Sequence, residues 1–581
     1  MCGIAGILNF NRSKVLHDDL QKITDVIAHR GPDGEGHWIN ENKNVGFGHR
    51  RLSIIDLTDS GKQPMHYASG RYTITFNGEI YNYIELRELL KTKGYIFLSN
   101  SDTEVLLAMY DWKKEHCLSF LDGMFAFAIW DENEQSLFCA RDRFGEKPFY
   151  YSLENGKEFC FASEMKALWA HGISKENDNK VLDNYLKTGS AIFAEDATKT
   201  FYAKIKQLDS GHYLIINNKM ELLTKCYYHL DHIQLNKNIK LTDAIEEFKQ
   251  LFLESIKLRL RSDVSVGSSL SGGLDSSSIV MLIDSLKDSM INQHTFSARF
   301  DGFVRDEGVQ MHQVLNKCKN VVPHEVWPQE QEFQEIIDKI IFHQEEPFGS
   351  SSVFAQWKVM ELAKKNGTVV LLDGQGADEY LAGYLPFYGL YFKQLFFTNK
   401  KKYQYEKAAY FKLRGIEGTS FESEETLRMK IGRLKRSMMN QKMPYDETSL
   451  SKELKRQTLS VGLKELLRYA DRNSMAHSRE VRLPFLSHKL VEFVNSLPDD
   501  FKLFEGWTKY ILRRSMEDVL PKEITWRIDK VGYETPQNNW LANEFWIEKI
   551  ANGKKKYAQF NSSKTRLISD WECIMLDKYL N

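Results

Sequence analysis

The pattern of apolar runs changes along the chain, and this change limits the fold more than any other feature of the sequence. Up to about residue 210, short strand-like runs such as "YTITFNGEIYNY" and "EFCFASE" are separated by turn residues. Such spacing favours mostly antiparallel sheets. From about residue 240, apolar strands alternate with helical patterns, as in "VSVGSSLSGGLDSSSIVMLI", which predicts a parallel α/β sheet. We therefore predict an α/β multidomain protein with one domain over 2–210, a linker over 211–240 and a second domain over 241–581.

Length and composition narrow the classes of partner. A chain of 581 residues is long enough for at least two hydrophobic cores. Its hydrophobic content of 42%, charged content of 27% and formal net charge of -1 are ordinary for a globular protein. Because no overall field would attract a polyanion, we expect small-molecule partners, no nucleic acid and no membrane, with a homodimer as the candidate assembly.

The cysteines and the N-terminus bear on the compartment. The 7 cysteines lie far apart and show no C-x-x-C spacing, which argues against a disulfide framework or a structural zinc site. The run "CGIAGIL" is too short for a secretory signal, and no run of about 18 apolar residues occurs. We expect a cytoplasmic protein.

Residues 398–458 differ from the rest of the second half. They are basic and weakly periodic, as in "TNKKKYQYEK" and "RLKRSMMNQKMPYDE". A nucleic-acid patch is one interpretation. Solvated helices or a family-specific insertion are favoured, because runs of charge usually form a solvated face.

The first residues suggest a catalytic unit. Removal of Met1, which aminopeptidases carry out readily before a small side chain, would leave Cys2 with both a thiol and a free α-amine. An amine with a pKa near 8 can accept the thiol proton, directly or through one water, so no separate histidine is required. Taken alone, Cys2 is more simply a small buried strand residue.

Three downstream segments could complete a pocket that hydrolyses an amide. Arg51 carries a planar fork that suits an α-carboxylate, Asn77 and Gly78 could stabilise a tetrahedral oxyanion, and Asp102 could hold a substrate ammonium. Each has a simpler interpretation: a surface ion pair for Arg51, a hairpin turn for "NG" and a helix N-cap for Asp102.

Together with Cys2 and "HRGPDGEG" at 29–36, these residues resemble the glutaminase domain of class II, N-terminal-nucleophile glutamine amidotransferases over about residues 2–190. The resemblance implies an Ntn-hydrolase sandwich of antiparallel sheets flanked by helices. It implies that Cys2 attacks the glutamine side-chain amide and that Asn77 and Gly78 form the oxyanion hole. The glutamine-binding residues that it implies are Arg51, Leu52, Ile54, Asn77, Gly78, Glu79 and Asp102.

A Ser/Gly loop in the second half could bind phosphate. "SLSGGLDSS" lies between a strand and a helix, so backbone N–H groups, serine hydroxyls and the positive end of the helix would surround an anion. No "GK[ST]" follows, so this is not a Walker A loop. Asp275 would repel phosphate unless a cation intervened, and this conflict predicts Mg²⁺. A second loop, "LLDGQGADEYLAGY", follows another apolar strand and offers Asp378 as a second metal ligand. For either loop alone, a common turn or a first-turn acidic pair is an equally good interpretation.

Jointly these loops resemble the ATP pyrophosphatase domain of asparagine synthetases, and "HSREVRLPFLS" and "WRIDKVGYETP" extend the likeness to about residue 540. The resemblance implies ATP and Mg²⁺ as cofactors, an acyl adenylate and release of pyrophosphate. It implies Asp275 and Asp378 as metal ligands and Lys530 as the residue that stabilises charge near the adenylate. The ATP-binding residues that it implies are Leu270, Ser271, Gly272, Gly273, Asp275, Ser276, Ser277, Asp373 and Gly374.

The combined halves predict glutamine-dependent amidation of a carboxylic acid, with AMP, pyrophosphate and glutamate as products. With aspartate as the acid, the product is asparagine. Gln375 stands where the family usually has glutamate and cannot act as a base, Ser487 replaces the usual aspartate, and 343–357 has an unfamiliar form. These departures leave open an acceptor such as a uronic acid in surface-polysaccharide synthesis. A β-lactam synthetase or a non-catalytic ammonia or nucleotide sensor is disfavoured, because Cys2 and its whole pocket are present.

Overall fold

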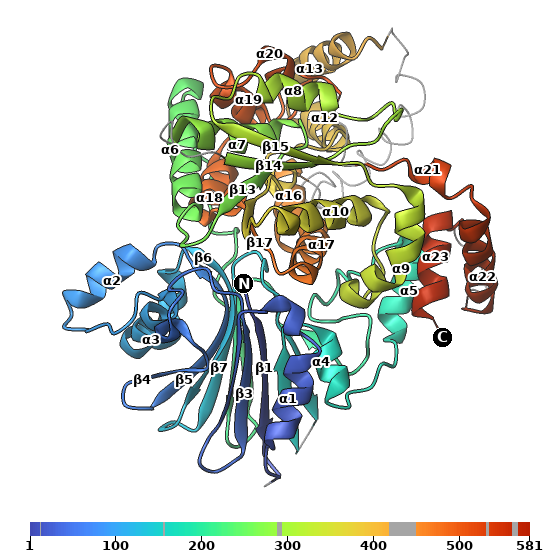
Figure 1. Ribbon diagram of the computed structural model, residues 1–581. Helices are drawn as coiled ribbons and strands as arrows, with labels where there is room; N and C mark the ends of the chain where they lie inside the picture. The colour runs from blue at the N-terminus through green and yellow to red at the C-terminus, as the bar shows by residue number, and fades with distance from the viewer. Residues whose placement is uncertain are drawn as a thin grey trace, which may run out of the picture.

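The computed structural model describes residues 1–11, 13–154, 157–286, 293–416, 449–529, 534–560 and 567–580. Figure 1 shows two parts, with the blue to cyan N-terminal half below and the green to red C-terminal half above. The N-terminus lies where the two halves meet, which places the start of the chain beside both.

The N-terminal half contains two antiparallel sheets of six strands each. The first has the order β10 (Lys206–Gln207), β8 (Tyr150–Glu154), β9 (Glu158–Ala162), β1 (Gly3–Asn9), β3 (Val45–Arg51), β2 (Gly34–Ile39). The second has the order β12 (Leu222–Cys226), β11 (His212–Asn217), β7 (Ser136–Arg141), β6 (Gly123–Asp131), β5 (Tyr72–Ile80), β4 (Met65–Tyr67).

The two sheets pack face to face because their strands are apolar on both sides. Ile4 and Leu8 of β1 face a core shared with Trp130 of β6, whereas Ile7 points to the opposite face of its sheet. That opposite face is covered by α1 (His17–Asp25) and α4 (Met165–Ala170), and α2 (Tyr83–Lys91) and α3 (Asp102–Lys113) cover the second sheet. A side chain at Gly6 would meet the ring of Phe161 at 2.3 Å. This close contact explains the small residue in the first strand.

The C-terminal half contains one parallel sheet of five strands. Its order is β15 (Val321–Val326), β14 (Gln293–Ala298), β13 (Val266–Ser269), β16 (Val370–Leu372), β17 (Glu480–Arg482). The crossovers run through helices, as parallel strands require. The helices used below are α7 (Leu274–Leu286), α9 (Glu330–Gln344), α10 (Ser352–Lys365), α11 (Ala377–Tyr380), α17 (Gly462–Ala476), α18 (His488–Ser496) and α19 (Tyr510–Met516).

The other helices in the described parts of the chain are α5 (Asn179–Thr188), α6 (Leu241–Arg259), α8 (Gly308–Leu315), α12 (Phe387–Thr398), α13 (Lys400–Leu413), α16 (Leu450–Leu459), α20 (Lys522–Thr525), α21 (Gln537–Trp540), α22 (Glu544–Phe560) and α23 (Asp570–Tyr579). Within the described residues, five short 3₁₀ helices connect other elements: η1 (Ala28–Arg30), η2 (Asp59–Gly61), η3 (Lys114–Ser119), η4 (Pro484–Leu486) and η5 (Asp499–Phe501).

The predicted fold class is confirmed: antiparallel sheets come first and a parallel α/β sheet follows. The expected linker, 211–240, contains β11 and β12, which pair with each other and with β7. The domain boundaries stay a prediction. Within the basic segment 398–458, α13 and α16 are helical, and residues 417–448 lie outside the described part of the chain.

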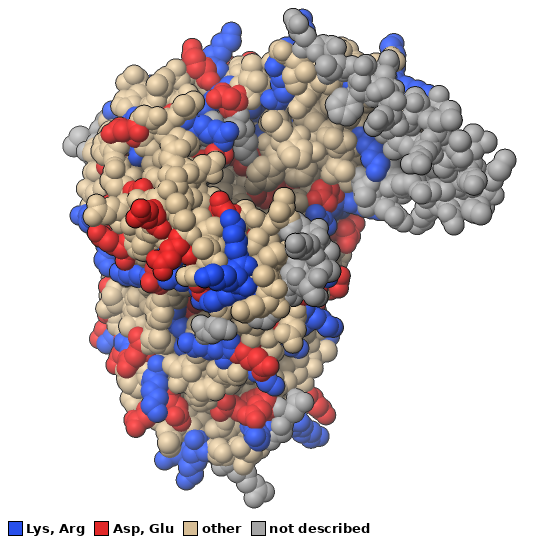
Figure 2. Space-filling model, turned by 90° about the vertical axis from the view of Figure 1, so that its right-hand side faces the viewer, with Lys and Arg blue, Asp and Glu red and all other residues tan. Residues whose placement is uncertain are grey.

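Charged side chains of both signs occur on the face drawn in Figure 2. Figure 2 shows Lys and Arg side chains interspersed with Asp and Glu over that face. Among the described residues, none of the helices combines the length and the apolar character that crossing a bilayer would need.

Candidate active sites

Cys2 lies directly before β1 at the junction of the two halves. Its backbone N–H donates to Asn77 Oδ1 at 2.9 Å, and its Sγ lies 3.9 Å from the carbonyl oxygen of Leu52. Only 8% of the residue is exposed, and this burial raises the pKa of the Cys2 thiol. The thiol therefore needs a nearby base to become a nucleophile.

Asn77 and Gly78 belong to β5 rather than to a hairpin turn. Asn77 is fully buried, and its Nδ2 has no hydrogen-bond partner among the described residues. A Cβ at Gly78 would lie 2.2 Å from the carbonyl oxygen of Met124, so only glycine fits there. An unpaired buried amide beside Cys2 is the kind of donor that a developing oxyanion needs.

Three buried carboxylates lie near one another at the junction, and one of them, Glu480, holds the N-terminal ammonium. Met1 N donates to Glu480 Oε2 at 2.8 Å, and both groups are fully buried. Glu79 of β5 and Asp102 of α3 are also buried. Burial, with Glu480 nearby, raises the pKa of Glu79 well above its ordinary value and that of Asp102 to about 6. The cluster can accept one ammonium group.

Asp102 is not the N-cap of its helix. Ser101 caps α3, and Asp102 Oδ2 accepts from the backbone N–H of Ile80 at 2.9 Å. Glu480 comes from the C-terminal half, within the segment "HSREVRLPFLS", which was not expected to take part in the first site. Only the fold, which places β17 beside the N-terminus, identifies it.

Arg51 is the last residue of β3, and Leu52 and Ile54 follow it. Arg51 is 9% exposed, and its guanidinium donates to the backbone carbonyls of Asp56 and Thr58, with 2.9 Å for the bond to Thr58. It is thus not the exposed surface ion pair of the simpler interpretation. Leu52 and Ile54 are buried, and the Ile54 carbonyl accepts from the N–H of Asp263 in the second half at 3.0 Å.

The Ser/Gly loop connects β13 to α7. Ser271 N donates to Ser276 Oγ at 3.2 Å, and the two hydroxyl oxygens lie 3.0 Å apart. Gly272 has φ +75°, a conformation that favours glycine. The N-terminus of the 13-residue helix α7 points into this loop, which therefore can receive a phosphate group.

The second loop lies beside the first because β13 and β16 are parallel neighbours. The carboxyl ends of parallel strands meet at one edge of the sheet, and α/β proteins bind their ligands at this edge. A Cβ at Gly374 would lie 3.0 Å from Asp275 Cβ and from Ser276 N. Asp373 follows β16, and burial raises the pKa of its carboxyl group.

Asp275 and Asp378 approach one cationic group, Lys509. The Lys509 ammonium lies 2.5 Å from Asp275 Oδ2 and 2.7 Å from Asp378 Oδ1. Carboxylates that converge on one positive charge next to a phosphate loop form a donor set that suits Mg²⁺. Lys509 has φ +51° and lies directly before α19, and it was not predicted. Lys530 lies outside the described residues.

A pocket of about 380 Å³ opens at this edge of the parallel sheet. Of the expected ATP-binding residues, Gly272 and Ser277 do not line it, and Ser277 is fully buried in α7. Gln375 lines it, as do Ser352, Val353 and Gln356 from the segment 343–357. Ser487 lies outside the lining, as the residue before α18. The expected ATP-binding residues that line the pocket are Leu270, Ser271, Gly273, Asp275, Ser276, Asp373 and Gly374.

Comparison with known proteins assigns both halves. Residues 1–228 match the glutamine amidotransferase domain family, and residues 247–569 match the asparagine synthase family. The chain is 33% identical to asparagine synthetase [glutamine-hydrolyzing] 1 of Bacillus subtilis, over 95% of this chain and 90% of the relative. The chain belongs to the glutamine-hydrolysing asparagine synthetase family.

Two other relatives carry a synthetase name and an amidase name. A putative asparagine synthetase of Methanocaldococcus jannaschii is 38% identical over 66% of this chain and 76% of the relative. A protein named amidase chry2 from Gibberella zeae is 28% identical over 93% and 90%. As an asparagine synthetase family member, the chain is a glutamine amidotransferase joined to an ATP-using synthetase domain.

Proposed function

We propose that this enzyme makes asparagine from aspartate, using ammonia released from glutamine and an acyl adenylate formed from ATP. Its products are then asparagine, glutamate, AMP and pyrophosphate. The observation that carries the proposal is that two distinct sites flank the junction: Cys2 with Asn77 on one side, and the loops of Asp275 and Asp378 on the other.

In the first site, Cys2 attacks the side-chain amide of glutamine. Once Met1 has been removed, the α-amine of Cys2 accepts the thiol proton, since burial disfavours a free thiolate. Asn77 Nδ2 and the backbone N–H of Gly78 stabilise the oxyanion. The acidic cluster around the Met1 ammonium supports a place for the ammonium group of glutamine beside Glu79 and Asp102. Arg51, Leu52 and Ile54 complete the glutamine pocket.

In the second site, the Ser/Gly loop holds the phosphates of ATP. The hydroxyls of Ser271 and Ser276 and the N-terminus of α7 support this assignment. Asp275 and Asp378 would hold Mg²⁺, which offsets phosphate charge when it is bound. The Lys509 ammonium lies between the same carboxylates, so it can also pair with the phosphate groups when ATP binds. Lys530 is proposed to stabilise charge near the adenylate.

Joining the sites in one chain protects the ammonia. Ammonia that is delivered internally avoids protonation in bulk water and reaches the adenylate at high local concentration. The carboxyl group of the acceptor is already ionised at neutral pH, so adenylation needs no base. Gln375 cannot take the proton that is lost after ammonia attacks.

A second acceptor is favoured by one observation. Gln375 replaces the usual glutamate at the pocket wall, and its Oε1 is buried without a partner among the described residues. A neutral amide there suits an acid that presents a hydroxyl donor, such as a uronic acid. Amidation of such a carboxylate is therefore the alternative.

We also propose a cytoplasmic location and a homodimer as the candidate assembly.

The test is a panel of acids assayed for AMP and pyrophosphate with glutamine and Mg-ATP. L-aspartate is expected to support release, with asparagine as the product. Release with a sugar acid but not with L-aspartate would replace asparagine synthesis by the alternative. No release with any acid would contradict both.

A further inference from the structure

A buried network of charges joins the two halves next to Cys2. Three cations and three carboxylates, each no more than 4% exposed, alternate across the junction. The cations therefore balance the carboxylates, as a buried network requires. Its members are Arg30, Lys166 and Glu164 from the N-terminal half and Glu345, Asp471 and Arg472 from the C-terminal half.

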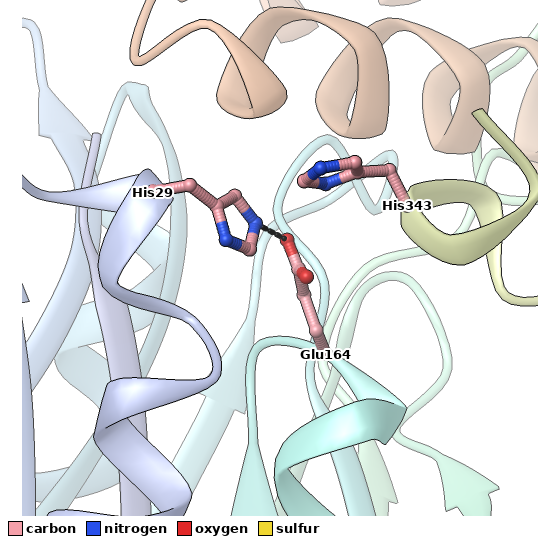
Figure 3. Close-up of side chains that lie close together, drawn as sticks. All are labelled: His29, Glu164 and His343. Carbon is pink, nitrogen blue, oxygen red and sulfur yellow. Dashed lines mark hydrogen bonds and ion pairs between the residues drawn. The ribbon is translucent and has the colours of Figure 1, made fainter. Parts of the chain in front are cut away.

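At one edge of this network, His29, Glu164 and His343 are arranged so that they could bind a metal ion. Figure 3 shows His29, Glu164 and His343 pointing toward one another, with His29 Nε2 3.1 Å from Glu164 Oε1. However, Glu164 already accepts from Arg30 at 2.7 Å and from Lys166. Burial lowers the pKa of His29 and lowers that of His343 to about 2. Cations on Glu164 would repel a metal ion, so we assign these side chains to the network.

Arg30 connects the network to the nucleophile. Its Nε donates to the backbone carbonyl of Cys2 at 3.0 Å. Its two terminal nitrogens donate to the carboxylate of Asp471 at 2.8 and 2.9 Å. A planar guanidinium held on two edges has a fixed orientation, which a flexible ammonium could not provide. Arg30, which contacts the Cys2 main chain, is therefore held by Glu164 of its own half and, on both terminal nitrogens, by a carboxylate of the other half.

Asp471 lies on α17, which also borders the ATP pocket. Leu466 and Tyr469 of α17 line that pocket. Asn473, two residues beyond Asp471, donates from Nδ2 to Gln356 Oε1 at 2.9 Å, and Gln356 lines the pocket as well. One helix thus contacts both the synthetase pocket and the residue that holds Cys2.

We propose that Arg30 and Asp471 are a positioning pair through which α17 of the synthetase half holds the glutaminase nucleophile in place. The inference rests on the proposed role of Cys2 in glutamine hydrolysis. It means that a carboxylate outside the glutaminase fold sets the rate of that reaction. Neither residue contacts the acceptor pocket, so synthesis from free ammonia does not need the pair.

The test compares two activities in Asp471→Asn. This change keeps the shape of the side chain and removes its charge. The glutaminase kcat is expected to fall between about tenfold and about 100-fold, the scale of a small misplacement of a reacting group. The KM for glutamine and the rate of ammonia-dependent AMP formation are expected to stay within about twofold. Arg30→Lys is expected to give the same loss, and the double variant no further loss, because the residues act as one unit.

Asp209→Asn is the matched control. Asp209 of the N-terminal half pairs with Lys464 of α17 at 2.5 Å, across the same junction of the two halves, but it does not contact Arg30. Its glutaminase activity is expected to be unchanged. Three results would overturn the proposal. One is full glutaminase activity in Asp471→Asn, and another is an equal loss of both activities in that variant. The third is a glutaminase loss in Asp209→Asn equal to that in Asp471→Asn.

Glutamine hydrolysis is measured without an acceptor, so a wrong acceptor leaves this test intact. If the proposed function were wrong, the wild-type protein itself would lack glutaminase activity or would form no AMP with any acid. If Asp471→Asn does not fold, Arg30→Lys provides the same comparison with the network charge retained.

Discussion

Replacement of Asn77 by alanine separates the chemistry of the first site from its packing. Asn77 Oδ1 accepts from the Cys2 N–H at 2.9 Å, while its buried Nδ2 has no partner among the described residues. The free donor is available only to a group that enters the site. Its removal therefore takes little from the resting protein and much from the transition state.

The expected loss follows from these two contacts. Removal of one oxyanion donor typically lowers kcat by about 10²–10³, or about 2.7–4 kcal/mol. Loss of the Oδ1 acceptor leaves the Cys2 nitrogen without its partner, at about 1–3 kcal/mol if no water replaces it. We expect the glutaminase kcat of Asn77→Ala to fall by about 10² or more. The KM for glutamine should change little, because Asp102 and Arg51 are untouched.

The assay measures glutamate release and, separately, AMP formation with ammonia as the nitrogen source. Ammonia-dependent AMP formation is expected to be unchanged, which also reports that the protein is folded. Asn40→Ala is the control: Asn40 is a buried asparagine whose side chain accepts from Asn44 and Val45, away from Cys2. Near-normal glutaminase in Asn77→Ala, or an equal loss in Asn40→Ala, would refute the reasoning.

Three other changes test separate parts of the account. Cys2→Ala is expected to abolish glutamine use but to spare ammonia-dependent synthesis, and equal loss with both nitrogen sources would contradict two separate sites. Asp378→Asn is expected to stop acid-dependent pyrophosphate release with glutaminase retained; undiminished pyrophosphate would show that the proposed metal role is wrong. Burial, and secondly the nearby charge of Asp142, raises the pKa of Glu146 to about 8. Between about pH 4.3 and about pH 8 the folded state therefore keeps a proton that the unfolded chain has released. The free energy of unfolding falls as the pH rises through this range. Glu146→Gln should therefore raise the Tm in calorimetry at about pH 8.5 and much less at about pH 5, whereas equal shifts at both values would contradict the assignment.

The order of strands and helices could be predicted because it depends on local patterns. The change from turn-separated strands to alternating strands and helices gave both sheet types correctly. The loops of Asp275 and Asp378 could be expected at one sheet edge, since each follows an apolar strand. Exact limits were harder to predict: β11 and β12 lie in the expected linker, because short paired strands have the same composition as a polar connection.

Three residues that reach these sites from distant parts of the chain were not predicted. Glu480 meets the N-terminus, and Lys509 meets Asp275 and Asp378, only because helices and strands far apart in sequence pack together. Asp471 likewise has an ordinary helical context, and its contact with Arg30 depends on the packing of the two halves. Side-chain partners of this kind follow from tertiary packing, which a local motif does not encode.

The most direct test of the central claim follows nitrogen from one half of the molecule to the other. The protein is incubated with glutamine that carries a labelled amide nitrogen, Mg-ATP, L-aspartate and an excess of unlabelled ammonium. The account predicts labelled asparagine with AMP and pyrophosphate in equal amounts, because the amide nitrogen passes from the Cys2 site to an adenylate. Release of ADP and phosphate instead, or unlabelled product alone, would contradict it.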